Sequence, residues 1–126
     1  MKIATLIARV LLGLIFLVFG LNGFLHFIPA PLPTGLAGQF LVVMIASHYW
    51  VVIFGIQTLC GLLLLINRFV PLALVLLGPV IVNIFFFHAL MAPTGLPLAI
   101  VVILLWAILA VRNKRHFEGI FVQRTE

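Results

Sequence analysis

The chain has 126 residues, of which 66% are hydrophobic and 7% are charged, and it carries seven Lys or Arg against two Asp or Glu. Soluble domains have about a quarter of their residues charged, so this composition excludes a water-soluble domain and predicts a protein that lies in the lipid bilayer. The formal net charge is +5, but a chain without a soluble domain has no water-exposed basic surface that could bind nucleic acid. We therefore discount a nucleic-acid partner.

Four apolar runs nearly exhaust the chain and predict one all-α domain, residues 1–126, folded as a polytopic four-transmembrane-helix bundle. The first run holds 26 residues with one charge. As a helix it is about 39 Å long, against the roughly 30 Å of a bilayer's hydrocarbon core. The predicted spans are residues 3–28, 48–66, 69–88 and 96–111, followed by a basic tail at residues 112–126.

The segment between the first two runs predicts a short outer interfacial helix. Its opening prolines, at positions 29, 31 and 33, lack the backbone donor that a continuing helix needs. Thr34 can then cap a helix from about Leu36 to Ala46, which is too short to span a bilayer. We expect this helix to lie at the outer interface or to run on into the second span.

The basic residues fall on one side of the predicted bundle. Lys2 and Arg9 lie at the start, Arg68 lies between the second and third spans, and the other four lie in the tail. The remaining loops, residues 29–47 and 89–97, contain none. The positive-inside rule therefore predicts that both termini are cytoplasmic and that the two longer loops are outside.

Glycines in the first two spans predict a packing seam. Gly13, Phe16, Gly20 and Gly23 are three or four residues apart, so they share one face of the first helix and let another helix approach closely. In the second span, Gly61 shares a face with Gln57, four residues before it.

Two further residues have predicted structural roles. Arg9 lies about two turns inside the first span, where its side chain either extends to the cytoplasmic headgroups or points into the bundle. Pro79 lies deep in the third span, where it frees a carbonyl one turn back and should kink the helix just before Asn83.

Polar side chains at membrane depth are candidate functional residues, and one set of amides and imidazoles maps to the outer half of the bundle. We predict that they form a ligand-binding pocket, with His48 at its mouth. The alternative is that the asparagines bond helix to helix and the histidines lie hydrated at the interface. The set is Asn22, His26, His48, Gln57, Asn83 and His88.

The same residues predict no metal site. Imidazole suits zinc and copper, but the spacing of these histidines matches no dedicated ligand motif. Residues 1–117 contain no Asp or Glu, which argues against a proton-coupled exporter that depends on an intramembrane carboxylate. The single cysteine, Cys60, excludes a dithiol redox relay. Catalysis would need a cofactor or a partner subunit, so the catalytic residues, if there are any, are unknown.

Short motifs follow one another in a fixed order through nearly the whole chain. They are Arg9-x-x-x-Gly13, Gly20-Leu21-Asn22-Gly23, Gln57-x-x-x-Gly61 with the leucines after it, Asn67-Arg68-Phe69-Val70-Pro71-Leu72-Ala73, and Asn83 to Pro93. In this order and spacing the chain resembles the DoxX family of four-helix bacterial membrane proteins. The resemblance implies a multi-pass protein of the bacterial cytoplasmic (inner) membrane.

The family takes its name from a subunit of a thiosulfate:quinone oxidoreductase, so the resemblance suggests a quinone as ligand or cofactor. Here Gln57 stands where many relatives carry an acidic residue, and Gly23 stands where a lysine is frequent. An ion pair or proton relay built on those positions would be missing.

Three functions remain open at this stage. The leading one is a non-catalytic or accessory membrane subunit that binds a small apolar or quinone-like ligand, or a partner protein, in an outward-facing polar pocket. The alternatives are a membrane subunit of a quinone-linked oxidoreductase with a redox partner, and a small channel or transporter that works as a homo-oligomer.

Overall fold

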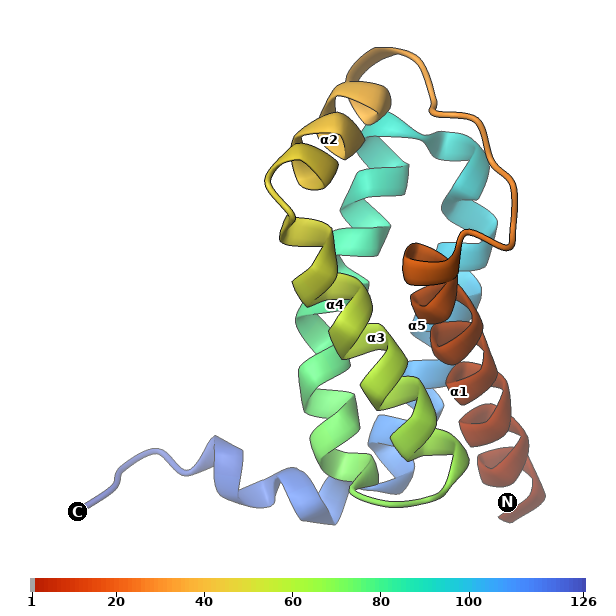
Figure 1. The fold of residues 1–126 in the computed structure, drawn as a ribbon. Coiled ribbons are helices and arrows are strands. Elements are labelled where there is room, and N and C mark those ends of the chain that lie inside the picture. The colour runs from red at the N-terminus through yellow and green to blue at the C-terminus, as the bar shows by residue number, and fades with distance from the viewer. Residues whose placement is uncertain (1) are drawn as a thin grey trace.

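A computed structural model describes residues 2–126, in which the regular secondary structure is all helical, with no strand among them (Figure 1). The predicted all-α class is confirmed. The elements are α1 (Lys2–Leu25), α2 (Gly35–Ala46), α3 (Tyr49–Leu65), α4 (Val70–Met91), the 3-10 turn η1 (Pro93–Gly95), α5 (Leu96–Arg112) and the 3-10 segment η2 (Lys114–Phe121).

The four long helices form an antiparallel bundle. α1 packs against α3 and α5, and α4 packs against the same two helices from the other side. Both ends of the chain lie at one end of the bundle, here called the terminal end. The short helix α2 lies across the opposite end, here called the α2 end, where it contacts α3 and α4.

Several helices are suited to a bilayer. α1, α4 and the segment Pro93–Arg112 are long and apolar enough to cross a membrane, and α2 and α3 together qualify as a fourth candidate, although they are bent by 90° at a short break. Residues 2–126 thus contain three candidate spans, or four if the bent pair counts as one. Together they indicate a multi-pass membrane protein.

The helix ends next to α2 are set by residues in left-handed backbone conformations. His26 (φ 53°) stops α1 at Leu25, and the Ile28 amide donates to the Asn22 side-chain oxygen at 2.7 Å. His48 (φ 61°) separates α2 from α3. Such conformations turn the chain sharply, which lets α2 fold back over the end of the bundle.

The glycines of α1 lie against α3. A Cβ added to Gly61 would overlap the backbone nitrogen of Leu17, and one added to Gly13 would lie 3.1 Å from the Gly61 carbonyl oxygen. Gly20 similarly faces the backbone of Thr58. Close approach of two backbones is what such glycines permit in a membrane, so this seam fixes the position of α3 relative to α1.

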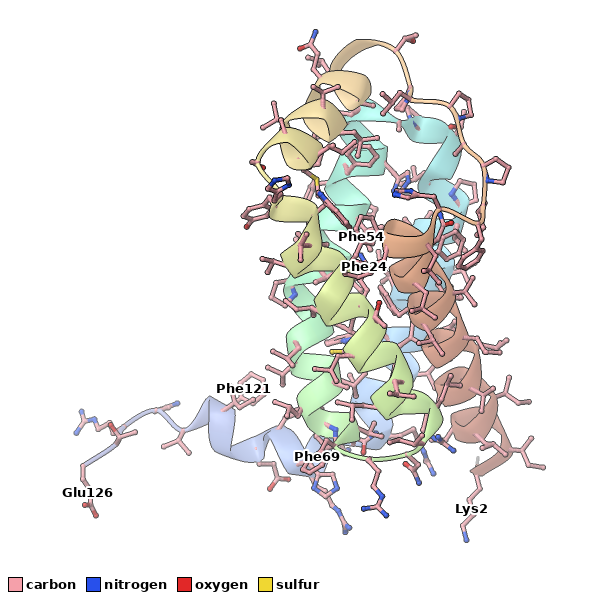
Figure 2. The ribbon with its side chains drawn as sticks, viewed as in Figure 1. Lys2, Phe24, Phe54, Phe69, Phe121 and Glu126 are labelled. Carbon is pink, nitrogen blue, oxygen red and sulfur yellow. The ribbon has the colours of Figure 1, made fainter. Side chains whose placement is uncertain are left out.

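Aromatic side chains continue the α1–α3 contact toward the α2 end. Phe24 and Trp50 have ring centroids 5.3 Å apart, and Trp50 lies 6.4 Å from Phe54. Figure 2 labels Phe24 and Phe54 at this level of the bundle.

A layer of fully buried leucines fills the middle of the bundle and its terminal half. Leu12, Leu64, Leu74, Leu77 and Leu109 each have no exposed surface. These side chains fill the centre of the bundle between its two ends.

The helix α4 continues through Pro79 from Val70 to Met91. Near this proline, the Trp106 indole donates to the Leu74 carbonyl oxygen at 2.9 Å. An indole N–H in lipid needs such a partner, and this bond ties α5 to α4.

Candidate functional site

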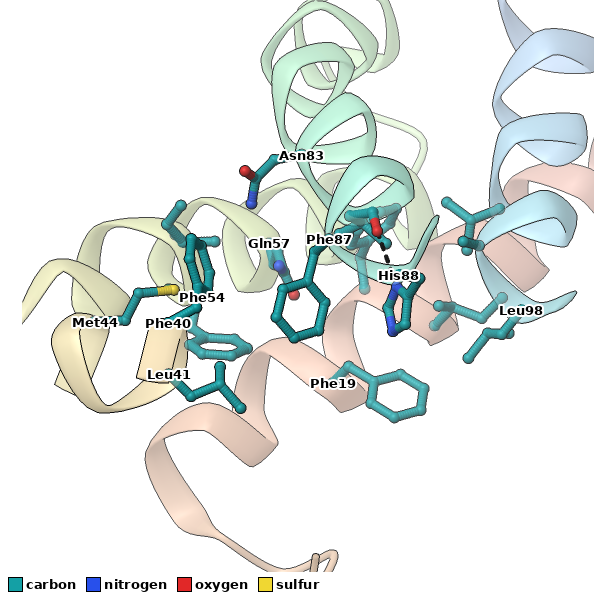
Figure 3. Close-up of a pocket in the computed structure, with 16 residues that line it drawn as sticks. Phe19, Phe40, Leu41, Met44, Phe54, Gln57, Asn83, Phe87, His88 and Leu98 are labelled. Atoms are coloured by element: carbon teal, nitrogen blue, oxygen red, sulfur yellow. Dashed lines mark hydrogen bonds between the residues drawn. The ribbon is translucent and has the colours of Figure 1, made fainter. Parts of the chain in front are cut away.

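A cavity of about 280 Å³ lies at the α2 end, between the four long helices and beneath α2. Every long helix contributes to its wall (Figure 3). Its surface is almost entirely apolar, with a few polar groups, as is usual for small-molecule sites. The lining residues are Ile15, Phe16, Phe19, Phe40, Leu41, Met44, Ile53, Phe54, Gln57, Asn83, Ile84, Phe87, His88, Leu98, Ala99 and Val102.

Gln57 is the buried polar residue of this wall. Its side chain is 6% exposed, and within residues 2–126 it has no hydrogen-bond partner. Among the described residues, no side-chain nitrogen or oxygen atom is both fully enclosed and without a hydrogen-bond partner. The amide atoms of Gln57 have no partner, so they are not fully enclosed by protein. The amide therefore faces the cavity, where it offers two N–H donors and one carbonyl acceptor.

Asn83 and His88 add polar atoms from α4. Asn83 also lines the cavity, but it is an exposed residue, and it has no hydrogen-bond partner within the described chain. The Nδ1 of His88 lies 2.9 Å from the Ile84 carbonyl oxygen. A carbonyl only accepts, so Nδ1 carries the proton and Nε2 of the neutral ring is left as an acceptor.

The His88 ring is held firmly in place. It packs edge-on against Phe87 with centroids 5.2 Å apart. On another side it touches Gly95, where an added Cβ would overlap the ring. The imidazole is thus fixed by η1 and by its own helix.

The short helix α2 roofs the cavity. Phe40, Leu41 and Met44 point into it, and the ring of Phe40 lies 5.3 Å from that of Phe87 on α4. The 90° bend between α2 and α3 places these side chains over the bundle.

The structure brings three of the six predicted site residues together. Gln57, Asn83 and His88 line the cavity, whereas Asn22, His26 and His48 do not. The Asn22 side-chain oxygen accepts a hydrogen bond from the Ile28 amide within a local turn, so this oxygen does not bond to a neighbouring helix. His26 and His48 are exposed and turn the chain at helix ends.

The described residues contain no group of three His, Cys, Asp or Glu side chains that could hold a metal ion. Cys60 is free and fully buried. It lies in the apolar core rather than in the cavity wall.

Comparison with known proteins gives no relative. No protein-family model, curated protein or solved structure matches the chain. The function must therefore be inferred from the site itself.

Sequence reasoning missed the apolar part of the site. Phe40 and Met44 are four residues apart and so share a face of α2, which could have indicated that this helix packs inward. Phe54 and Phe87 gave no such signal, because every span is rich in phenylalanine and leucine.

Proposed function

We propose that the chain is a DoxX-like membrane protein whose cavity at the α2 end binds a small, apolar ring compound with a hydrogen-bonding oxygen, such as the head of a quinone. The observation that carries this proposal is Gln57, a buried amide that faces the cavity without a protein partner. An amide in an apolar interior is costly unless it finds a partner. A ligand carbonyl would accept from its N–H group.

The size and chemistry of the cavity support this ligand class. Its volume of about 280 Å³ is near the lower end of the usual range for ligand pockets, so it suits a single ring and not a large cofactor. Phe54 and Phe87 offer aromatic surface to that ring. The amides of Gln57 and Asn83 supply donors, and a hydroxyl of a reduced ring could donate to His88 Nε2.

We propose that the ligand enters from the bilayer between α1 and α5. Phe19 and Leu98 line the cavity from these two helices, and they are 40% and 46% exposed on the outside of the bundle. A lipid-soluble compound would thus reach the cavity without passing through water.

For the membrane arrangement we propose four spans, with α3 as the short one, α2 at the outer interface and both termini in the cytoplasm. The terminal end carries all seven basic residues, including Arg68 in the turn between α3 and α4, as the positive-inside rule requires.

The segment η2 leaves the bundle at a steep angle (Figure 1) and carries Phe117 and Phe121 beside Lys114 and Arg115, a pattern suited to the membrane surface.

The role favoured by this structure is ligand binding by an accessory subunit. The buried leucine layer closes the bundle below the cavity, which favours binding over conduction through a single chain. A quinone-linked oxidoreductase would need a partner that delivers electrons to the bound ring.

A binding titration with matched variants tests the proposal. The purified protein in nanodiscs would be titrated with a short-chain benzoquinone, and heat release would be recorded for the unaltered protein, Gln57→Leu and Gln39→Leu. Gln39 lies on α2, is exposed and does not line the cavity, so it receives the same substitution outside the site.

We expect saturable binding of one ligand per chain. Loss of one hydrogen bond is worth about 0.5–1.5 kcal/mol, so Gln57→Leu should weaken binding roughly two- to tenfold, and Gln39→Leu should not change it. Unsaturable partitioning, or equal effects of both variants, would contradict the proposal. A redox partner that copurifies in stoichiometric amount would assign the protein to the oxidoreductase class.

A further inference from the structure

A second cavity, of about 240 Å³, lies at the terminal end of the bundle. α1, the turn between α3 and α4, and the end of α5 form its wall. In contrast to the first cavity, most of its lining side chains are polar or basic. The residues are Lys2, Thr5, Leu6, Arg9, Asn67, Val70, Leu109 and Asn113.

Arg9 is the central cation of this cavity. Its Nη1 donates to the carbonyl oxygens of Leu64 and Leu65, at 2.5 Å and 3.3 Å, at the end of α3. The remaining N–H groups of the half-buried guanidinium, on Nε and Nη2, have no partner within the described chain. The bonds to α3 therefore fix the guanidinium and leave donors for a ligand.

Other donors surround it. Asn113 uses one amide hydrogen on the Leu109 carbonyl oxygen at 2.8 Å and keeps the second. The Asn67 amide and the Lys2 ammonium have no hydrogen-bond partner within residues 2–126. Figure 2 shows Lys2 at this end of the bundle.

The positive charge of the cavity is not balanced by the protein. Residues 1–117 contain no Asp or Glu. The two acidic residues, Glu118 and Glu126, lie in the tail that extends away from the bundle (Figure 1). Arg112 adds a further cation beside the cavity, where its Nε donates to the Thr5 hydroxyl at 3.2 Å.

We infer that this cavity binds a phosphate group, supplied by the headgroup of an anionic phospholipid. A phosphate oxygen accepts several charge-assisted hydrogen bonds at once, and the free N–H groups of Arg9, Lys2, Asn67 and Asn113 come from three separate parts of the chain. Leu6, which is 50% exposed, offers an apolar edge for the glycerol and acyl part of the lipid. Free inorganic phosphate has the same headgroup chemistry but cannot use that edge.

The inference is tested by native mass spectrometry of the full chain released from a neutral detergent. The added probes are phosphatidylglycerol, phosphatidylcholine and inorganic phosphate, each offered separately. Arg9 also holds the end of α3, so its removal would not separate binding from folding. The test variants are therefore Lys2→Gln and Asn67→Ala, with Lys114→Gln as the control that removes the same charge outside this cavity.

We expect one phosphatidylglycerol to be retained per chain, in preference to phosphatidylcholine. Lys2 lines the cavity, so loss of its charge-assisted hydrogen bond to the phosphate in Lys2→Gln should reduce the affinity for phosphatidylglycerol about fivefold, which corresponds to about 1 kcal/mol. Asn67→Ala should reduce it two- to threefold, and Lys114→Gln should have no measurable effect.

Three results would overturn the inference. One is equal retention of the two lipids, and another is an equal loss of affinity in Lys2→Gln and Lys114→Gln, which would show general surface attraction. The third is retention of neither lipid nor inorganic phosphate. Retention of inorganic phosphate alone, with the same dependence on Lys2 and Asn67, would keep the phosphate site and replace the lipid by the free ion.

Discussion

Substitution of Gln57 by leucine separates a ligand-binding amide from a structural one. In the structure this side chain is 6% exposed and has no hydrogen-bond partner among the described residues. Leucine has a similar volume and no polar atoms, so it leaves no new void. The substitution removes the cost of burying an unpartnered amide.

The size of the effect follows from the surroundings of the amide. A fully enclosed and unpartnered polar group costs about 1–3 kcal/mol. The amide of Gln57 borders a cavity and is not sealed, so the gain belongs at the lower end of this range. We expect Gln57→Leu to raise the free energy of unfolding by about 1 kcal/mol while it weakens ligand binding.

Cys60 provides the assay. It is the only cysteine of the chain and is fully buried, so a thiol-specific fluorophore reacts with it only when the bundle opens. Unfolding by sodium dodecyl sulfate in mixed micelles would be followed by this reaction for the unaltered protein and both glutamine variants. Gln39→Leu, at an exposed site, should stay within about 0.5 kcal/mol. A loss of 1 kcal/mol or more in Gln57→Leu would refute the reasoning, because it would show that the amide bonds within the protein.

Three further outcomes follow from the packing and the charge distribution. Gly61→Ala should destabilise the bundle by about 1–3 kcal/mol in the same assay, because the new Cβ overlaps the α1 backbone. Gly55→Ala is the control: nothing lies within 4 Å of its added Cβ, so it should be neutral or stabilising by up to about 1 kcal/mol. Equal effects of the two variants would contradict close packing of α1 and α3 at Gly61. Trp106→Phe should cost about 0.5–1.5 kcal/mol through loss of the bond to α4, and an unchanged midpoint would show that this bond is not made. In intact cells, a cysteine at position 94 should react with an impermeant thiol reagent and one at position 124 should not, and reversed labelling would overturn the proposed topology.

The helical class and the long helices were accessible from the sequence because their signal is local. Run length and hydropathy determine which segments become apolar helices. The glycine spacing in α1 also indicated a face that packs closely, and this face meets α3 at Gly61. The partner of Arg9 was left open because the carbonyls at the end of α3 are 55 residues away along the chain.

The composition of the cavity was only partly accessible. The polar residues Gln57, Asn83 and His88 stand out in apolar sequence, and all three line the cavity. Asn22 looked equivalent, but a short side chain next to a helix end bonds to its own turn, which periodicity does not reveal. The roof could not be foreseen, because the 90° bend at α2 depends on the left-handed backbone of His48.

Photoaffinity labelling tests the central claim, that the cavity under α2 binds a small ring compound, most directly. A one-ring quinone with a diazirine group would be activated in nanodiscs that contain the protein, and the labelled peptides would be located by mass spectrometry. We expect label on residues 40–44 of α2 and 84–88 of α4, which line the cavity, and we expect unlabelled quinone to prevent it. Label spread over the lipid-facing sides of the helices, or label that unlabelled quinone does not reduce, would contradict the claim.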